Sequence, residues 1–588
     1  MLPRVPRYFV YVLACLLCSS FATLVPPVAA QRSESAVRPK LDAALSARVL
    51  QGTSGWQRVI VRTDPEALPA VAELLRHGGG QIARFHDGIS GLTATVRLHQ
   101  LETLAQLAAI RSISLDAEVT ALQTSSTGYT LRGTLGLTQQ AATGHRVGIA
   151  VIDSGLETGP EFDERIAAFY DFTRSGNPGV PNDAYGHGTH VAGLIGGNGN
   201  ASQGEFRGVA PRARLIVLKV LDGAGRGTTS DVISAVEYVT KHKAKLGVDI
   251  INLSLGHPIF EPAGTDPLVQ AVEAAVRAGI VVVAAAGNQG QSLETGAPGY
   301  AGIVSPANAP SVITVGAVRT FDSLIRSDDR VAPYSSRGPS WYDGRAKPDV
   351  VAPGHGLVAA AAPNSALYAN NPGARVGDAY LRLGGTSMAA GVVAGTVALI
   401  LEAHRTAFPA GPSLTPNAIK AVLEYTALSV RDDQGAEYDH LTQGAGVVNP
   451  PGAVELAARL DTARPVASWW LTSGVNTWTI LEGETLPWSG SVIWGGQAGA
   501  GTAVYTNEPA WAQNIVWGNN IVWGNNIVWG NNIVWGSNIV WGNALIGAYD
   551  GTSTTWGMAS QDPASTVWGT LSGPASSTAF VLTSPDSK

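Results

Sequence analysis

Four short segments in the middle of the chain carry residues that together could perform nucleophilic catalysis. Asp153 ends the apolar run 147–152, and His187 lies in the sequence Gly-His-Gly-Thr-His. Ser387 lies in Gly-Thr-Ser-Met-Ala before a long apolar segment, and Asn288 follows another apolar run. A serine becomes a good nucleophile when a base removes its proton, and a carboxylate can orient that base. These residue types therefore point to hydrolysis through a covalent intermediate.

Each of these residues also has an ordinary structural explanation. An acid after a strand can cap a loop, an Asn can form a turn, and a Ser at a helix start is a frequent N-cap. His187 and His190 have a spacing that metal sites also use, but no Glu lies between them and no third ligand is evident. We therefore interpret His187 as a base and His190 as a buried structural residue.

The order of these residues and their local sequences resemble one known family. The chain has Val-Ile-Asp-Ser-Gly at Asp153, Gly-His-Gly-Thr-His-Val-Ala-Gly at His187 and Gly-Thr-Ser-Met-Ala at Ser387, with Asn288 between the last two. Asp, then His, then Ser is the order that subtilisins use. From about residue 125 to 460 the chain resembles the subtilisin-like serine proteases, or subtilases.

The resemblance implies a serine endopeptidase that cleaves extended polypeptides through an acyl-enzyme intermediate. Ser387 would attack the scissile carbonyl, His187 would accept and return the proton, and Asp153 would orient the imidazole. Asn288 and the Ser387 backbone N–H would form the oxyanion hole. No cofactor is implied for catalysis. Members of the family bind structural calcium, but this sequence identifies no ligands, so the metal-binding residues are unknown.

The same resemblance implies a set of substrate-binding residues. Two edge strands would pair with the substrate backbone, since main-chain hydrogen bonds bind extended peptides. A pocket would hold the side chain before the scissile bond. The edge residues are Gly225, Arg226, Gly227, Ser254, Leu255 and Gly256, and the pocket residues are Ala285, Ala286, Gly287 and Val304. Because many relatives have a smaller residue at Val304, we expect a preference for modest apolar side chains.

One residue departs from the family pattern. Gly391 stands where the family usually has Pro, which affects local rigidity but removes no catalytic group.

Two other kinds of protein are alternatives to this interpretation. A sedolisin-like acid peptidase would have Glu at His187 and Asp at Asn288, so we expect neutral to alkaline activity instead. A binding protein on an inactive protease scaffold would not need an intact catalytic set.

The elements that must position these residues alternate in type from 122 to 460. Short Val-, Ile- and Ala-rich runs predict strands, and apolar residues at helical spacing predict helices. Continuous apolar strands between helices indicate an α/β fold with a parallel sheet covered on both faces. The predicted strands are 147–152, 215–220, 250–255, 280–285 and 312–318, and the predicted helices are 231–242, 267–278 and 388–404.

Residues 1–30 have the pattern of a secretory signal peptide. Basic residues precede an apolar stretch that contains both cysteines, Cys15 and Cys18, and residues 28–30 (Val-Ala-Ala) offer a cleavage site. An uncleaved membrane anchor and a lipoprotein signal at Cys15 are weaker alternatives, because the apolar run is short for either. We expect a secreted, extracellular protein without disulfides, which could also associate with a cell surface.

Residues 31–121 match the prosegment of the family, with a folded part at about 56–120. Strand-like and helix-like runs follow the order β-α-β-β-α-β, which indicates a small ferredoxin-like α+β unit. The last predicted strand is 111–119. Prosegments of this family assist folding and inhibit the protease, so the resemblance implies a self-processing zymogen with its own propeptide as inhibitor. We expect cleavage between Ala117 and Tyr129.

Residues 461–588 form a C-terminal extension in which Trp, Gly, Asn and Thr dominate. The hexapeptide Asn-Ile-Val-Trp-Gly-Asn repeats between 514 and 543. In an extended chain, Trp and Ile would share one face and Val the other, whereas the Gly-Asn-Asn steps favour turns. The extension is therefore β-rich or of low complexity. Its Trp residues could bind a cell surface, a glycan or another protein.

The charge of the chain excludes some partners. The formal net charge is −6 over 588 residues, which gives no reason to expect binding to nucleic acid or to an anionic membrane. Polypeptide substrates remain the expected partners.

Overall fold

The computed structural model describes residues 40–51, 55–121, 131–138, 141–174, 176–291, 296–464 and 471–490, together with strands β23 (Val492–Ile493) and β24 (Leu545–Ile546). The segment interpreted as a signal peptide and the repeats at 514–543 lie outside the described residues. Residues 122–130, which include most of the window expected for cleavage, also lie outside them.

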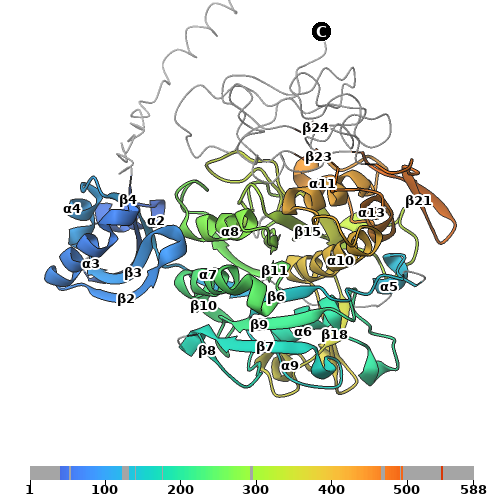
Figure 1. Cartoon of the computed structure of the whole chain (residues 1–588), viewed down its shortest axis with the longest axis horizontal. Coiled ribbons are helices and arrows are strands. Elements are labelled where there is room, and N and C mark those ends of the chain that lie inside the picture. Colours follow the sequence, from blue (N-terminus) through green and yellow to red (C-terminus); the bar gives the residue numbers. More distant parts are fainter. Residues whose placement is uncertain are drawn as a thin grey trace, which may run out of the picture.

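A nine-stranded, mostly parallel sheet forms the centre of the larger unit (Figure 1). Its strands follow the order β16-β15-β13-β11-β6-β9-β7-β8, and β17 also pairs with β15. All neighbours are parallel except the pairs β15–β16 and β7–β8. The bounds are β6 (Gly148–Asp153), β7 (Ile166–Asp171), β8 (Asn177–Pro178), β9 (Arg214–Lys219), β11 (Ile250–Leu253), β13 (Val281–Ala285), β15 (Ile313–Arg319), β16 (Arg330–Val331) and β17 (Val350–Pro353).

Helices cover both faces of this sheet, as the continuous apolar strands predict. Alternate side chains of a strand point to opposite faces, and in β6 Ala150 and Ile152 pack with helices α7 and α8 while Ile149 and Val151 pack with α6 and α10. The bounds are α6 (His187–Gly196), α7 (Thr229–Leu246), α8 (Pro267–Arg277), α10 (Thr386–Ala407), α11 (Pro416–Thr426) and α13 (Pro450–Ala457). Shorter elements are α5 (Leu131–Thr134), α9 (Ala366–Asn370), α12 (His440–Gln443), β18 (Leu357–Ala360), β19 (Arg375–Val376) and β20 (Tyr380–Leu383).

Helix α10 runs through the middle of the core. It is long and apolar enough to cross a membrane, but 89% of its most apolar window is buried inside the protein. Gly391 lies within it, and a Cβ at this position would make ordinary contacts of 3.4 Å with Val191. The helix therefore continues across the residue that departs from the family pattern.

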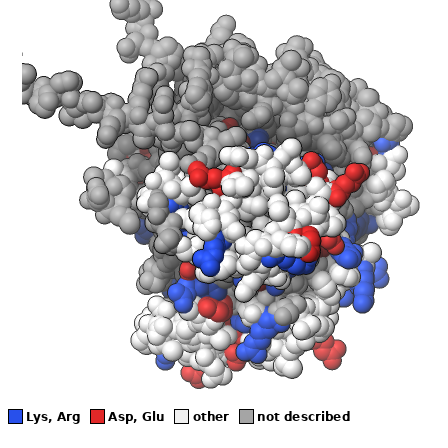
Figure 2. Space-filling model, turned by 90° about the vertical axis from the view of Figure 1, so that its left-hand side faces the viewer, with Lys and Arg blue, Asp and Glu red and all other residues white. Residues whose placement is uncertain are grey.

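A smaller N-terminal unit lies beside α7 and α8 (Figure 1). Its four strands form an antiparallel sheet in the order β2-β3-β1-β4, and its helices enclose a separate apolar core. From β1 onward the element order is β-α-β-β-α-β, as the sequence predicts, but the expected start of the folded part at about 56 is too late, because helix α2 precedes β1 and buries Leu45 in this core. The bounds are α2 (Ala43–Leu50), β1 (Trp56–Thr63), α3 (Leu68–His77), β2 (Gln81–His86), β3 (Gly91–Arg97), α4 (Leu101–Ala105) and β4 (Ile110–Leu115). Basic and acidic side chains are interspersed on the described surface of this side of the molecule (Figure 2).

The strand predicted at 111–119 is wrong in one respect, because it is two strands in two different sheets. Strand β4 ends at Leu115, and β5 (Glu118–Ala121) pairs instead with β10 (Arg226–Thr228) and β12 (Leu255–Pro258) of the larger unit. Alternation of apolar residues continues across the break, so the sequence pattern alone did not locate it.

The folded part of the larger unit extends beyond the boundary expected at 460. Residues 471–490 contain the hairpin of β21 (Trp478–Leu481) and β22 (Glu484–Pro487). Leu481 and Trp488 are buried in the same apolar cluster as α10 and α13, and the Trp488 indole donates a hydrogen bond of 2.8 Å to Thr479. The hairpin therefore completes the core and is not part of a separate tail.

Two truncations test this boundary on a Ser387→Ala background. A chain that ends at Gly490 keeps the hairpin and Trp488 and serves as the reference. A chain that ends at Arg464 should lose about 3 kcal/mol or more of unfolding free energy, because it loses the buried Trp488 and Leu481. Urea unfolding followed by circular dichroism measures both, and equal stabilities of the two truncations would refute the assignment.

Candidate active site

Asp153 and His187 form a buried acid–base pair. Asp153 is the last residue of β6, and His187 is the first residue of α6. The imidazole Nδ1 lies 2.7 Å from Asp153 Oδ1, and both side chains are fully buried. A carboxylate only accepts hydrogen bonds, so Nδ1 must carry the proton and Nε2 has a lone pair in the neutral imidazole. His187 Nε2 has no hydrogen-bond partner among the described residues, which leaves it able to accept a proton.

Close packing between α6 and the turn after β6 explains the small residues around His187. A Cβ added to Gly188 would come within 2.2 Å of the backbone oxygen of Gly155. A larger residue at Gly188 would therefore push the helix away from the carboxyl end of β6. The Gly-His-Gly sequence thus allows the imidazole to reach Asp153.

Ser387 lies in the first turn of α10, where its hydroxyl is paired with a backbone group and not with His187. Its hydroxyl donates a hydrogen bond of 2.9 Å to the backbone oxygen of Ser254, and the Ser254 hydroxyl donates one of 2.9 Å to the backbone oxygen of Ser387. Backbone N–H groups in the first turn of a helix have no partner within the helix. The N–H of Ser387 is therefore suited to bind negative charge.

Asn288 has a side-chain orientation that Thr386 fixes. The amide oxygen of Asn288 accepts hydrogen bonds of 3.1 Å from the backbone N–H and from the hydroxyl of Thr386. Because the oxygen is held by two donors, the Asn288 Nδ2 group faces elsewhere with two protons to donate. Thr386 directly precedes Ser387, so this amide is tied to the start of α10.

The two predicted edge segments lie on either side of a strand from the N-terminal unit. Strand β5 pairs antiparallel with both β10 and β12, with Thr120 opposite Arg226 and opposite Gly256. Gly225 precedes β10 with φ of +75°, and the ring of Tyr185 lies against it. Leu255 pairs with Ala121, so β5 runs toward Ser254 and the start of α10.

The predicted pocket residues also meet. A Cβ at Gly256 would come within 2.7 Å of Val304 Cγ2, and one at Gly287 within 3.0 Å of Val304 Cγ1. The backbone N–H of Val304 donates to the oxygen of Ala286 at 3.1 Å. Ala285, at the end of β13, is fully buried. The Val304 side chain therefore occupies the space between the two glycines.

His190 is buried, as the sequence predicts, and it joins backbone segments. Its Nε2 lies 3.1 Å from the oxygen of Leu357 and 3.0 Å from that of Leu381, in β18 and β20. Burial, reinforced by the charge of His187, lowers the pKa of His190 to about 3. His190 is therefore a neutral hydrogen-bond donor and not a second base.

Three buried residues behind the acid–base pair were not singled out from the sequence. These are Ser154, Asp183 and Lys219. Lys219 is the residue opposite Asp153 in the parallel pairing of β6 and β9. A polar residue directly after Asp153 and an acid four positions before His187 were the available signals, but each is common in loops.

The arrangement can perform acyl transfer. It combines a hydroxyl at a helix start, a base held by a buried carboxylate and two donors for a developing oxyanion. Among the residues that the structure describes, no group of three or more His, Cys, Asp or Glu could hold a metal ion.

Comparisons with known proteins agree with this chemistry. A model of the Subtilase family matches residues 144–447. The chain is similar to serine protease AprX of Bacillus subtilis (strain 168), with 38% identity over 362 residues, 61% of this chain and 76% of that protein. It is 34% identical to subtilisin DY of Bacillus licheniformis over 316 residues, 54% of this chain and 93% of that protein.

One solved structure gives the same fold. The crystal structure of fervidolysin from Fervidobacterium pennivorans, a keratinolytic enzyme related to subtilisin, matches with a TM-score of 0.54. The match covers 73% of this chain and 63% of that chain at 23% identity. At this identity the likeness concerns the fold alone.

The low pKa of His190 gives the protein a specific sensitivity to acid. The unfolded chain binds a proton at His190 below its ordinary pKa of 6.5, whereas the folded protein does so only near pH 3. The unfolding free energy should therefore fall as the pH drops below 6.5, by about 1.4 kcal/mol per pH unit. Urea unfolding of Ser387→Ala and of Ser387→Ala/His190→Gln at pH 7 and pH 5 measures this. The variant with Gln should lose less stability, and equal losses would contradict the interpretation.

Proposed function

This chain belongs to the subtilase family of serine endopeptidases, and from this premise we propose that it is an exported zymogen that uses Asp153, His187 and Ser387 to hydrolyse polypeptides. Serine endopeptidase activity follows from membership of the family. The particular residues, the processing and the export are the proposal.

The proposed reaction begins with Ser387. Its hydroxyl turns from the Ser254 oxygen toward His187 Nε2, which takes the proton while the oxygen attacks the scissile carbonyl. The imidazolium that forms is stabilised by Asp153 at 2.7 Å. His187 then donates the proton to the leaving amine. Water repeats the sequence on the acyl-enzyme and releases the carboxylate product.

Asn288 and the backbone of Ser387 would bind the oxyanion of each tetrahedral intermediate. The Asn288 amide is held by Thr386 before substrate arrives, so it need not reorganise during the reaction. Loss of one such donor in a serine protease costs about 10²–10³ in kcat. No cofactor is needed for these steps.

The observation that carries the proposal is the position of β5. An extended segment of the chain lies between β10 and β12 as a substrate would, and it leads toward Ser254 and Ser387. Val119 within it is fully buried among apolar residues of the larger unit. A protease whose own chain occupies its substrate-binding strands is inhibited until that segment leaves.

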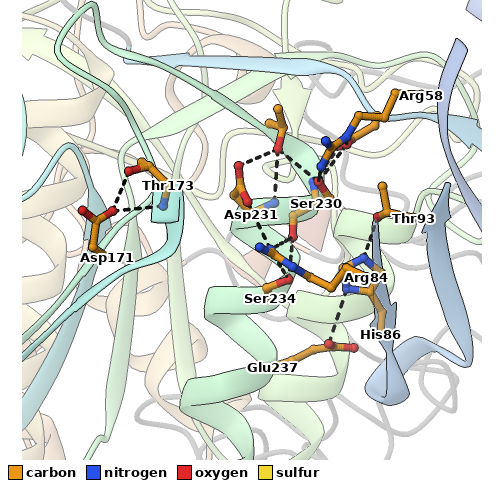
Figure 3. Close-up of polar contacts among 12 residues, drawn as sticks. Arg58, Arg84, His86, Thr93, Asp171, Thr173, Ser230, Asp231, Ser234 and Glu237 are labelled. Atoms are coloured by element: carbon orange, nitrogen blue, oxygen red, sulfur yellow. Dashed lines mark hydrogen bonds and ion pairs between the residues drawn. The ribbon is translucent and has the colours of Figure 1, made fainter. Parts of the chain in front are cut away.

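Contacts of the N-terminal unit support the role of a propeptide (Figure 3). Asp116 accepts hydrogen bonds from the backbone N–H and hydroxyl of Ser230, at 2.8 and 2.7 Å, in the first turn of α7. A carboxylate at a helix N-terminus is favoured by the helix dipole. Arg84 donates to Asp231 at 3.1 Å and to Ser234 at 2.7 Å. These contacts fix the unit beside the strands that β5 joins.

Cleavage of this segment would mature the enzyme. Because Ala121 pairs with Leu255, next to the Ser254 that contacts Ser387, we expect the cleaved bond just after Ala121. This lies inside the window 117–129 expected from the sequence. The side chain before that bond is then Ala121, a small apolar residue as expected for the pocket.

Export is proposed because residues 1–30 have the pattern of a signal peptide. The C-terminal extension, residues 461–588, has no role in the proposed catalysis. A zymogen that stays blocked by its own segment is suited to passage out of the cell. The Trp-rich repeats lie outside the described residues, so binding of a surface, glycan or protein by them stays a prediction from sequence. A structural calcium ion likewise stays a proposal without assigned ligands.

Replacement of Ser387 tests the proposed function directly. We expect the purified wild-type chain to lose the residues that precede about residue 122 and to cleave casein, since a self-processing protease needs its own nucleophile. Ser387→Ala should keep its full-length mass and show no cleavage. Intact mass spectrometry, N-terminal sequencing and casein hydrolysis measure these outcomes.

The matched control is Ser202→Ala, which replaces a serine whose hydroxyl bonds the backbone of Gly199 and Phe206 and which should process normally. Casein cleavage by Ser387→Ala, after removal of contaminating protease, would contradict the proposal. A mature N-terminus outside residues 117–129 would contradict only the expected processing site.

Val304 should set the size of the preferred side chain before the scissile bond. Val304→Gly removes the isopropyl group between Gly256 and Gly287 and opens the pocket. The ratio of kcat/KM for Phe to that for Ala at this position should rise about 10-fold or more, because buried apolar area in an enlarged pocket stabilises larger side chains by about 1–3 kcal/mol. A library of fluorogenic peptides measures the ratio. A wild-type preference for Phe and Tyr, or an unchanged ratio, would refute this role.

A further inference from the structure

Ser154, which follows Asp153 in the chain, uses each of its polar groups although it is fully buried. Its backbone N–H donates to Asp153 Oδ1 at 2.7 Å, and its backbone oxygen accepts from the ammonium group of Lys219. Its hydroxyl donates to Asp183 Oδ1 at 2.8 Å and accepts from the backbone N–H of Gly188 at 2.9 Å. Ser154 therefore links the catalytic acid to the first turn of α6.

Asp183 accepts four hydrogen bonds and is buried, with only 2% of the residue exposed. Oδ1 accepts from the Ser154 hydroxyl and, at 2.7 Å, from the backbone N–H of Gly186. Oδ2 accepts from the backbone N–H of Thr189 at 2.8 Å and from its hydroxyl at 2.7 Å. Gly186 and Thr189 flank the first residues of α6, so this carboxylate caps the helix that begins with His187.

We propose that Asp183 is a positioning residue for the hydrolysis: through Ser154 it holds the carboxylate of Asp153 and the first turn of α6 in one fixed arrangement. This inference rests on the proposed function of the acid–base pair. Asp183 touches neither substrate nor reacting atoms. It acts by keeping His187 at 2.7 Å from Asp153 while the proton moves.

Only a carboxylate satisfies the groups that surround Asp183. All four partners donate, and an ionised Asp offers two oxygens that only accept. An Asn would keep one accepting oxygen and would turn an NH2 group toward donors on the other side. Hydrogen bonds to a charged group are also roughly twice as strong as those between neutral groups. Asp183→Asn is therefore nearly isosteric but electrically mismatched.

The expected consequence is a loss of turnover with little effect on substrate binding. The strands that bind substrate, β10 and β12, do not contact Asp183 through any of these hydrogen bonds. A displacement of about 1 Å at the reacting groups can cost about 10² in rate. We therefore expect Asp183→Asn to lower kcat about 10- to 100-fold, with KM changed less than about twofold.

The experiment compares Asp183→Asn, Ser154→Ala and the double variant as full chains. Active sites are counted by titration with a fluorophosphonate, and kcat and KM are measured per titrated site on one fluorogenic peptide. Where maturation is slow, an added trace of wild-type enzyme cleaves the prosegment and is subtracted by a blank. Ser154→Ala keeps the bonds of Asp183 to Gly186 and Thr189 but removes the hydroxyl that joins Asp183 to the Gly188 N–H, so it tests the link apart from the carboxylate.

The matched control is Asp266→Asn. Asp266 is also 2% exposed and caps a helix, with its Oδ1 accepting from Leu268 and Val269 in α8, but it makes no hydrogen bond to the acid–base pair. It should lower the unfolding midpoint without a change of kcat per titrated site. Urea unfolding of each variant on the Ser387→Ala background compares their stabilities.

The inference is supported if Asp183→Asn and Ser154→Ala both lower kcat and the double variant loses no more than the worse single variant, since residues in one network are not additive. It is overturned by an unchanged kcat in Asp183→Asn, by a normal Ser154→Ala, by additive losses, or by an equal loss in Asp266→Asn. Activity in Ser387→Ala would instead refute the proposed function, and the two failures are thereby distinguished.

Discussion

A carboxylate buried at the end of a parallel strand must be paired, and this need organises the site. Asp153 is fully buried and meets His187 at 2.7 Å. An unpaired buried charge is costly, and a partner with good geometry offsets that cost. The imidazole can reach Asp153 because Gly188 lets α6 approach the backbone of Gly155 closely. The helix start, the turn after β6 and the small residues around His187 are consequences of this one contact.

The strands proposed to bind substrate lie in a second sheet and are already paired in this chain. Strand β5 completes the hydrogen bonds of β10 and β12, which would otherwise present unpaired edges. The N-terminal unit is fixed by polar contacts with α7, including Asp116 at the helix start. In the proposed zymogen, inhibition and substrate binding would therefore use one set of main-chain hydrogen bonds, and release of β5 would expose both edges to a polypeptide.

Much of the fold could be predicted from the sequence, because buried parallel strands are continuous apolar runs. The strand at 147–152 and the helix at 267–278 lie within about a residue of β6 and α8. Strand β7 was not predicted, although residues 166–170 form a short apolar run, and most of its residues are only partly buried. The break between β4 and β5 depends on pairing with strands more than 100 residues away, which local patterns do not report. Asp183 was missed because its partners converge only in the folded chain.

Covalent labelling of the matured enzyme tests the central claim most directly. A fluorophosphonate reacts with a serine hydroxyl only when a base activates it, and peptide mass mapping identifies the labelled residue. The account predicts one adduct, on Ser387, and a labelling rate at least about 10³-fold lower in His187→Ala. An adduct on another serine, or an equal labelling rate in His187→Ala, would contradict the account.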